Sequence, residues 1–203
     1  NRINRVVTNL IGQEQLKRNM DYNKAIIKHY TDIWHITPNI IKRTDGKIYE
    51  LPVDFSILEF APIGERNYWA YATSGMSFNQ KEHPTELHFF SPDQSQIEAI
   101  ILTSIAHFHL FGERIGLGHT VNFGIPWRKY SKCTYGLISL PYNDGPNLEN
   151  MVFNKIVTKF YWVIPITKEE REFKIENGLN ALEEKFDVSN FNYINPMRES
   201  LIH

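Results

Sequence analysis

Cysteine is nearly absent from this chain, which has Cys133 as the single cysteine among its 203 residues. An intramolecular disulfide and a cysteine-rich zinc site are therefore excluded, and the composition fits a reducing compartment. No stretch approaches the roughly 20 apolar residues that a membrane-spanning helix requires, and no signal-peptide pattern opens the sequence. We therefore expect a cytoplasmic protein that does not enter a membrane.

A dominant charge of one sign is also missing, because 22 basic and 23 acidic residues leave a formal net charge of −1. Such a chain has no overall field that would attract nucleic acid or an anionic membrane, so neither is an expected partner. The charge is uneven, however: residues 1–30 carry six basic and two acidic residues, whereas residues 168–203 carry five basic and eight acidic residues. Charge runs of this kind are typical of solvated helix faces.

Internal repeats, low-complexity tracts and Gly/Ser linkers are absent as well. Hydrophobic residues make up 42% of the chain and aromatic residues 13%, which is enough to bury a substantial core. Because domains of this size usually hold one core, we expect a single domain over residues 1–203.

Two segments have the spacing of apolar residues that predicts helices. The first covers residues 12–35 and ends before Pro38. The second is expected to begin at Ser91 and to run to Gly112. At its start, a hydroxyl cap, a proline, an acid and then Gln94 form the pattern of a capping box. A third helical region begins with the capping box formed by Thr167 and Glu170, and Gly178 interrupts it.

The rest of the pattern predicts strands at residues 53–60, 69–73, 86–90, 119–124, 135–142 and 159–166. The sequence APIGER between the first two strands indicates a hairpin turn. Short connections between consecutive strands favour antiparallel pairing, so the expected fold class is α+β, with a mixed, largely antiparallel sheet flanked by helices.

The stretch YATSGMS, residues 71–77, surrounds Gly75 with hydroxyl groups. A hydrolase nucleophile elbow needs the order Gly-x-Ser-x-Gly on a strand-to-helix turn. Here the order is Ser-Gly-Met-Ser, and a polar loop follows. We therefore interpret Ser74, Gly75 and Ser77 as parts of a turn at the end of a strand.

Histidines leave a second chemical possibility open. His107 and His109 are two positions apart on a predicted helix and cannot share a face, and the motif HExxH is absent. His88 and His119 on neighbouring strands, together with Ser77, form the alternative hypothesis of an enzyme or a small-ligand or metal-binding protein. Our leading expectation includes no metal, no cofactor and no catalytic residue.

Six segments occur together in one order: YATSGMS, TELHFFSP, LGHTVNFG, LISLPY, FYWVIPITKEEREFKIENGLNAL and NPMRES. In this order and spacing the chain resembles the suppressor of fused domain in its single-domain bacterial form. The resemblance covers residues 50–202, whereas residues 1–50 match only as a helical lead-in. It implies a structural role for the residues that match the family motifs, which are Thr73, Ser74, Gly75, Ser77, Glu86, His119, Thr120, Trp162 and Pro165.

The resemblance also implies a non-catalytic domain that binds other proteins. Stand-alone bacterial members are similar to immunity proteins and antitoxins that neutralise a cognate toxin, often a nuclease, by direct binding. The peptide clasp of the animal members needs a second domain for which this chain has no room. An acidic helix surface is expected to bind a basic partner by charge complementarity. The competing interpretation of the same residues is a helix face that only contacts solvent. The surface consists of Glu169, Glu170, Glu172, Glu176, Glu183 and Glu184.

Overall fold

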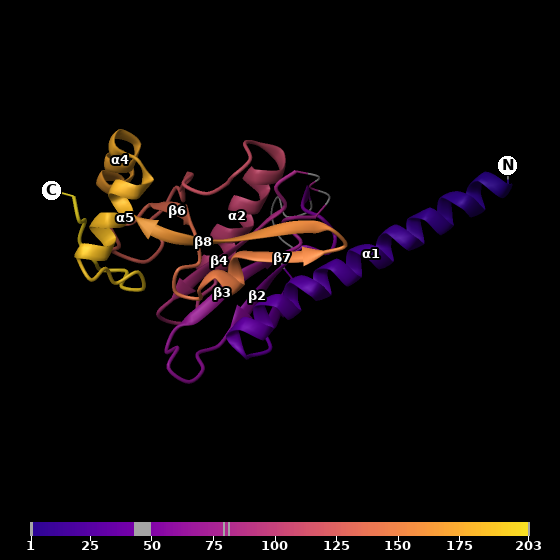
Figure 1. Cartoon of the computed structure of the whole chain (residues 1–203), viewed down its shortest axis with the longest axis horizontal. Coiled ribbons are helices and arrows are strands. Elements are labelled where there is room, and N and C mark those ends of the chain that lie inside the picture. The colour runs from indigo at the N-terminus through magenta and orange to yellow at the C-terminus, as the bar shows by residue number, and fades with distance from the viewer. Residues whose placement is uncertain (1, 43–49, 79, 81, 203) are drawn as a thin grey trace.

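The computed structural model describes residues 2–42, 50–78, 80 and 82–202. Figure 1 shows that the long helix α1 (Arg2–Trp34) runs along one side of a sheet and that its N-terminal part projects beyond the rest of the chain. The other helices are α2 (Ile97–Phe111), α3 (Pro146–Glu149), α4 (Lys168–Asn177) and α5 (Leu179–Val188). Within the described residues, no helix is both long enough and apolar enough to cross a membrane.

Helix α1 buries one stripe of side chains against the sheet. Residues four positions apart lie on one face of a helix, and the buried stripe consists of Tyr22, Ile26, Tyr30 and Trp34. Burial of a side chain such as Ile26 stabilises the fold by about 1.5–3 kcal/mol. The helix ends where His35 takes a φ of 55° and Pro38 follows. The predicted helix over residues 12–35 is confirmed, although it begins earlier, at Arg2.

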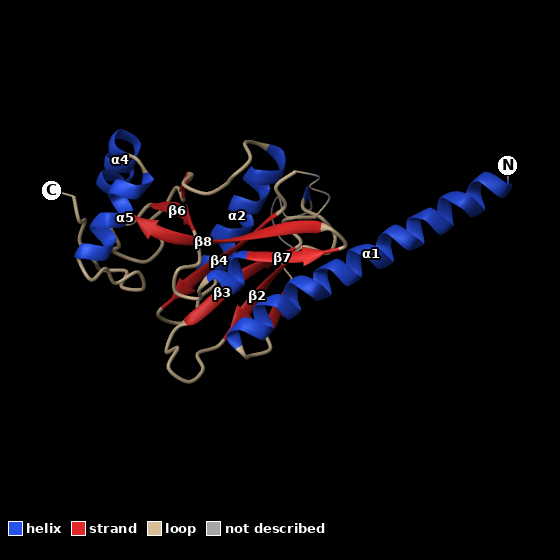
Figure 2. Ribbon diagram, in the orientation of Figure 1, coloured by secondary structure: helices blue, strands red, loops and turns tan. Residues whose placement is uncertain are grey.

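Within the described residues, eight strands form one mixed sheet, with the order β1-β2-β3-β4-β8-β6-β5 and with β7 paired to β8 outside this path. Figure 2 shows the strands in red. Of the strand pairs in this described sheet, β4 and β8 are parallel and the others are antiparallel. The predicted α+β fold with a largely antiparallel sheet is confirmed. The strands are β1 (Asn39–Ile41), β2 (Ser56–Phe60), β3 (Trp69–Ser74), β4 (Thr85–Ser91), β5 (Thr120–Asn122), β6 (Tyr135–Ser139), β7 (Asn150–Phe153) and β8 (Ile156–Ile166).

The two faces of this sheet carry separate apolar cores, because neighbouring strand residues point to opposite sides. On β2, Leu58 joins the core under α1, α3 and α5, whereas Ile57 joins the core under α2. Phe90 and Phe89 divide in the same way on β4. The sheet is therefore the middle layer of three.

Helix α2 begins six residues later than the sequence predicted. Ser91 is the last residue of β4 and pairs with Trp69, so it does not cap the helix. The helix begins at Ile97, whose N–H donates to the Ser95 hydroxyl at 3.1 Å. The predicted start at Ser91 is wrong because strand pairing takes precedence over the local capping pattern. The predicted end is confirmed, since Gly112 follows the last helical residue.

The capping box before α4 is confirmed. The Thr167 hydroxyl accepts from the Glu170 N–H at 3.3 Å, and the Glu170 carboxylate accepts from the Thr167 N–H at 2.8 Å. Gly178, with a φ of 94°, separates α4 from α5. The interruption that the sequence predicted at this glycine is therefore present.

Candidate functional site

The turn after β3 is built around the carboxylate of Glu86 from β4. This carboxylate accepts four hydrogen bonds, from the N–H groups of Gly75 (3.1 Å) and Ser77 (2.9 Å) and from the hydroxyls of Ser77 (2.6 Å) and Thr73 (2.5 Å). Gly75 has a φ of 97°, a backbone conformation that a residue with a Cβ rarely adopts. Glu86 is fully buried, and this burial raises the pKa of its carboxyl although the Ser77 and Thr73 hydrogen bonds lower it.

A chain of hydroxyl groups continues from this turn to α1 and β8. The Tyr22 hydroxyl donates to the Ser77 hydroxyl at 2.9 Å and lies 2.6 Å from the Thr158 hydroxyl. In the described part of the chain, Ser77 has hydrogen bonds with Tyr22 and Glu86 and none with a histidine. We name this set of residues, Tyr22, Thr73, Gly75, Ser77, Glu86 and Thr158, the Glu86 network. Its geometry connects the turn, α1 and three strands, and in the described residues it does not contain the histidine that pairs with the nucleophile in a Ser–His arrangement.

His88 lies two residues further along β4, in the core beneath α1. Its ring is fully buried between aromatic rings, with centroid distances of 5.6 Å to Trp34 and 5.2 Å to Phe90. Its Nε2 lies 3.6 Å from a carboxylate oxygen of Asp144, and the other oxygen of Asp144 accepts from the Trp34 indole at 2.7 Å. Burial lowers the pKa of His88 to about 3 and raises the pKa of Asp144 to about 6. The imidazole is therefore neutral at pH 7, and the pair is not an ion pair.

The pKa of His88 predicts how the stability of the protein depends on pH. When folding lowers the pKa of a histidine, the protein loses stability as the pH falls below the pKa of that histidine in the unfolded chain, about 6.5. The contribution of His88 alone approaches a loss of about 1.4 kcal/mol per pH unit between about pH 6.5 and pH 3. Asp144, with a raised folded pKa, has the opposite slope between about pH 4 and pH 6, where its neutral form stabilises the fold.

Because the two contributions oppose each other between about pH 4 and pH 6, this pair should change the stability of the wild type little in that range. His88→Phe leaves the contribution of Asp144 alone and should gain stability as the pH falls, whereas Asp144→Asn leaves the contribution of His88 alone and should lose stability. The measurement is urea unfolding of both variants and the wild type at pH 7, 6, 5 and 4. The core variant Phe89→Leu is the control, because Phe89 is buried on the other face of the sheet and carries no titratable group, so the variant should lower the stability equally at each pH. Parallel pH profiles for His88→Phe and the wild type would contradict the prediction.

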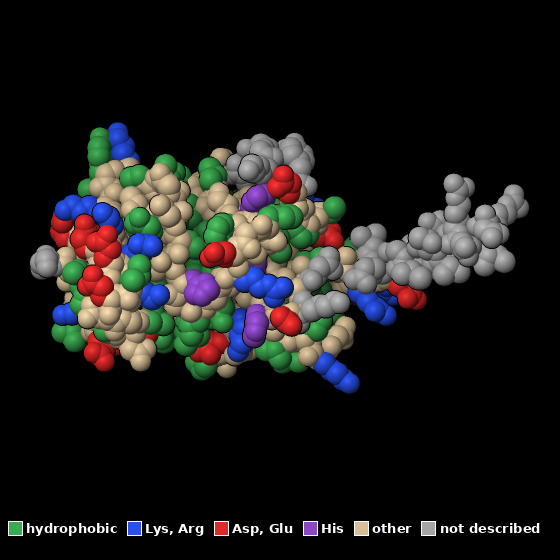
Figure 3. Space-filling view, turned by 90° about the horizontal axis from the view of Figure 1, so that it is seen from above, with side chains coloured by type: hydrophobic (Ala, Val, Ile, Leu, Met, Phe, Trp, Pro, Cys, Tyr) green, Lys and Arg blue, Asp and Glu red, His purple; other side chains and the backbone are tan. Residues whose placement is uncertain are grey.

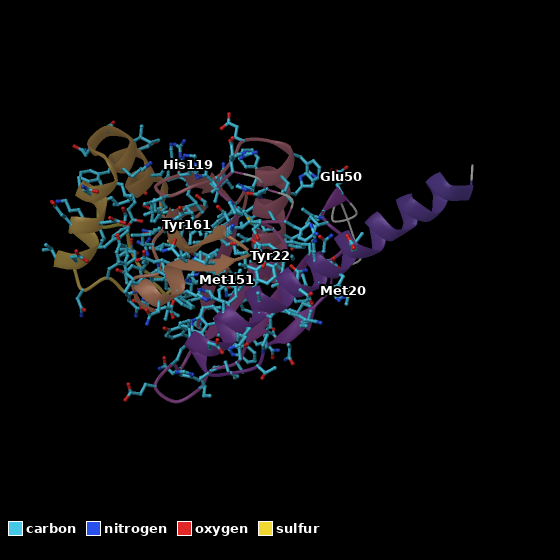
Figure 4. All side chains as sticks on the ribbon, turned by 45° about the vertical axis from the view of Figure 1, so that its right-hand side comes forward. Met20, Tyr22, Glu50, His119, Met151 and Tyr161 are labelled. Carbon is cyan, nitrogen blue, oxygen red and sulfur yellow. The ribbon has the colours of Figure 1, made fainter. Side chains whose placement is uncertain are left out.

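His119 lies apart from these two centres. It is exposed at the start of β5, and its Nδ1 accepts from the Gly116 N–H at 3.3 Å. Figure 4 shows His119 well separated from Tyr22, the residue that contacts Ser77. The structure therefore does not bring Ser77, His88 and His119 together at the end of the sheet, and the alternative hypothesis based on their convergence is wrong. Among the described residues, no group of three or more His, Cys, Asp or Glu side chains is placed to hold a metal ion.

A buried ion pair holds the C-terminal segment against the start of α4. The Arg198 guanidinium donates to both oxygens of Glu170 at 2.7 Å and to the Pro165 carbonyl at 2.7 Å. The Leu201 N–H also donates to Glu170, at 3.1 Å. Glu170 has no exposed surface, so its predicted place in an acidic binding surface is wrong. The physical reason is that its carboxylate serves as both a helix cap and the partner of Arg198.

The other predicted acidic residues divide between α4 and α5. Glu169, Glu172, Glu176 and Glu184 are exposed, and Glu183 is half-buried. Figure 3 shows acidic side chains, mixed with basic ones, over the end of the molecule that carries these helices. Trp162 is buried on β8, and its ring lies parallel to the His88 ring at 6.4 Å.

An apolar groove of about 300 Å³ lies between α2 and β5. Several of its side chains are large, apolar and exposed, including Phe108 (48%) and Ile125 (52%). The apolar spacing that predicts helix α2 does not show which of its apolar side chains stay exposed, so the sequence did not indicate the groove. The groove is lined by Ile100, Ile101, Ser104, Ile105, Phe108, Thr120, Val121, Asn122, Phe123 and Ile125.

Strand β5 ends the strand order of the described sheet, so one of its edges is unpaired there. Toward β6, the Ile138 N–H donates to the His119 carbonyl and the Phe123 N–H donates to the Thr134 carbonyl. Backbone groups alternate in direction along an antiparallel strand. The N–H and C=O groups of Thr120 and Asn122 therefore point away from β6, at the open edge of the sheet.

These features define an α+β domain whose buried charged groups hold its elements together and whose exposed apolar groove follows a sheet edge. The family described as suppressor of fused protein (SUFU) matches residues 52–199. The chain therefore belongs to the suppressor of fused family, as the sequence resemblance indicated.

Solved structures agree with this assignment. A SUFU homolog from Neisseria gonorrhoeae is 31% identical, with a TM-score of 0.78, over 91% of this chain and 98% of that chain. The Sufu-Fu complex structure is 16% identical, with a TM-score of 0.67, over 89% and 92%. Drosophila Suppressor of Fused is 15% identical, with a TM-score of 0.68, and 88% of this chain matches 50% of that chain. The last two show the fold alone. A search of curated protein sequences finds no significant match.

Proposed function

We propose that this chain is a non-catalytic domain that binds an extended segment of a partner protein along the α2–β5 groove. The observation that carries the proposal is the apolar groove beside the unpaired edge of β5. Exposed apolar patches commonly mark interaction sites, and an extended peptide can add a strand to an open sheet edge. The backbone groups of Thr120 and Asn122 would supply the hydrogen bonds, and the groove would hold alternate side chains of the partner.

The partner that we propose is a cognate bacterial toxin, which would make this chain a cytoplasmic immunity protein or antitoxin. The sequence resemblance to the single-domain bacterial form supports this assignment, and the Neisseria gonorrhoeae homolog is matched over almost its whole length. The Sufu-Fu complex supports protein binding as a property that the fold can provide. The exposed acidic residues of α4 and α5 add charge complementarity to a basic toxin such as a nuclease.

Co-expression with a candidate toxin, chosen from the proteins encoded beside its gene, tests this function. The wild-type chain should restore growth and form a stoichiometric complex with a Kd on the order of nanomolar. Phe108→Asp should weaken the complex by about tenfold or more, because it places a charge in the apolar groove. Thr120→Pro should also weaken it, because proline removes an outward N–H from the sheet edge.

Val53→Asp is the matched control, since Val53 is 95% exposed and does not line the groove. It should bind as tightly as the wild type. Growth that stays inhibited although both proteins are expressed would contradict the toxin assignment. Equal binding by Phe108→Asp, Thr120→Pro and Val53→Asp would instead contradict the groove as the binding surface.

A further inference from the structure

A second pocket, of about 220 Å³, opens beside α5 at the end opposite the projecting part of α1. Four separate parts of the chain form it: the end of β6 and the loop after it, Ile164 of β8, one face of α5, and the segment that follows α5. We name it the tyrosine–carboxylate pocket, and its walls include Ser139, Tyr142, Glu183, Phe186, Asp187 and Tyr193.

Two carboxylates of α5 face this pocket, since Glu183 and Asp187 are four residues apart and therefore share a helix face. Glu183 accepts from the Ser139 hydroxyl at 3.1 Å and from the Tyr142 hydroxyl at 3.4 Å. In the described part of the chain, neither carboxylate forms a salt bridge. The pocket therefore has negative charge that no basic side chain of the described chain neutralises.

The pKa values of Tyr193 and Tyr142 are raised in part by this charge. Burial, followed by the negative charges of Asp187 and Glu183, raises the pKa of Tyr193. Burial and then Glu183 raise the pKa of Tyr142 in the same way. The phenol groups and the carboxylates line one space, and a cation there would offset the negative charge of the two carboxylates.

The aromatic walls are held in place by neighbouring rings. Tyr193 lies 4.7 Å from Trp162 and 4.6 Å from Phe191, and Phe191 stacks on Phe186 at 4.2 Å. Phe186 is almost completely buried. Because these rings are fixed before any ligand arrives, little conformational entropy is lost when a planar group packs against them.

From this combination we infer that the tyrosine–carboxylate pocket receives an arginine side chain of the partner protein. A guanidinium pairs with a carboxylate through two hydrogen bonds and also packs flat on aromatic rings. A lysine ammonium is a point charge without the planar shape that both interactions use. The exposed residues Glu176 and Glu184 on the same two helices extend the negative surface around the pocket, which favours a macromolecular partner. This inference rests on the proposed protein-binding function and gives it a specificity site distinct from the groove.

The test uses NMR spectra of the full chain with isotope-labelled tyrosine, titrated with a blocked Gly-Arg-Gly peptide. The resonances of Tyr142 and Tyr193 should shift in a saturable way, with a Kd on the order of millimolar for one side chain. The double variant Glu183→Gln/Asp187→Asn should bind the peptide about tenfold more weakly. The control Glu176→Gln/Glu184→Gln, which removes the same charge outside the pocket, should bind within about twofold of the wild type.

Further probes separate the possible occupants. A blocked Gly-citrulline-Gly peptide has the same shape without the charge, and it should not shift the two tyrosines. If agmatine binds about tenfold more tightly than the peptide, the ligand of the pocket is a small cation and the inference of a protein partner is wrong. Equal binding of the citrulline peptide, or no saturable shift, would overturn the inference.

The experiment also distinguishes this inference from the proposed function. If the toxin complex forms with wild-type affinity in the Glu183→Gln/Asp187→Asn variant, the pocket inference fails while protein binding stands. If the arginine peptide occupies the pocket and no toxin complex forms, the toxin assignment fails instead.

Discussion

Replacing Glu86 with alanine is expected to lower the free energy of unfolding by about 3–5 kcal/mol. The carboxylate accepts four hydrogen bonds in a site without solvent, from Gly75, Thr73 and the backbone and side chain of Ser77. Its removal leaves several buried donors unsatisfied, and each costs about 1–3 kcal/mol. Urea unfolding followed by circular dichroism measures the change.

Two further variants make the Glu86 prediction specific. Glu86→Gln retains one acceptor oxygen but turns an NH₂ group toward the donors, so its loss should be smaller, about 1–2 kcal/mol. This variant also keeps the prediction testable if the alanine variant does not fold. Glu82→Ala removes an exposed carboxylate from the segment before β4 and should change the stability by less than about 0.5 kcal/mol. Equal unfolding midpoints for all three variants would show that the Glu86 network contributes nothing to stability.

Arg198→Ala should cost a similar amount, about 3–5 kcal/mol, for an electrostatic reason. Arg198 is the buried cation that pairs with both oxygens of Glu170, and its loss leaves a fully buried carboxylate without compensation. The Pro165 carbonyl loses its hydrogen bond at the same time. Thermal and urea unfolding of the variant measure the change.

An exposed ion pair provides the matched control for Arg198. Lys168 lies 3.5 Å from Glu172 on the surface of α4, so Lys168→Ala should change the stability by less than about 0.5 kcal/mol. The double variant Glu170→Gln/Arg198→Met should recover part of the stability, because it removes both buried charges. If Arg198→Ala and Lys168→Ala behave alike, burial does not determine the strength of these pairs.

The elements that the sequence predicted correctly depend on local patterns. The capping box joins Thr167 to Glu170, three positions further on, and the buried stripe of α1 repeats every four residues. The strands at β3, β4 and β8 follow runs of β-branched and aromatic residues. Helix α2 is the exception, because the Ser91 to Gln94 pattern has the form of a cap while Ser91 belongs to β4.

The polar centres depend on residues far apart in the chain, and the sequence did not predict them. Tyr22 contacts Thr158 across 136 positions, and Trp34 contacts Asp144 across 110. Asp144 lies in a loop without a distinguishing motif, so nothing in the sequence indicated its place beside His88. The matching family motif indicated that Glu86 belongs to the scaffold, but it did not indicate the four donors around its carboxylate.

The sequence by itself determined the fold class, the family and the position of most helices and strands. These properties follow from periodicity and from ordered motifs, both of which depend only on the order of residues in the chain. Tertiary structure alone decided that Glu170 is buried, that His88 lies in the core and that the α2–β5 groove and the tyrosine–carboxylate pocket exist. Burial and cavities arise only where distant segments pack together, because the solvent exposure of a side chain depends on neighbours that its local sequence does not specify.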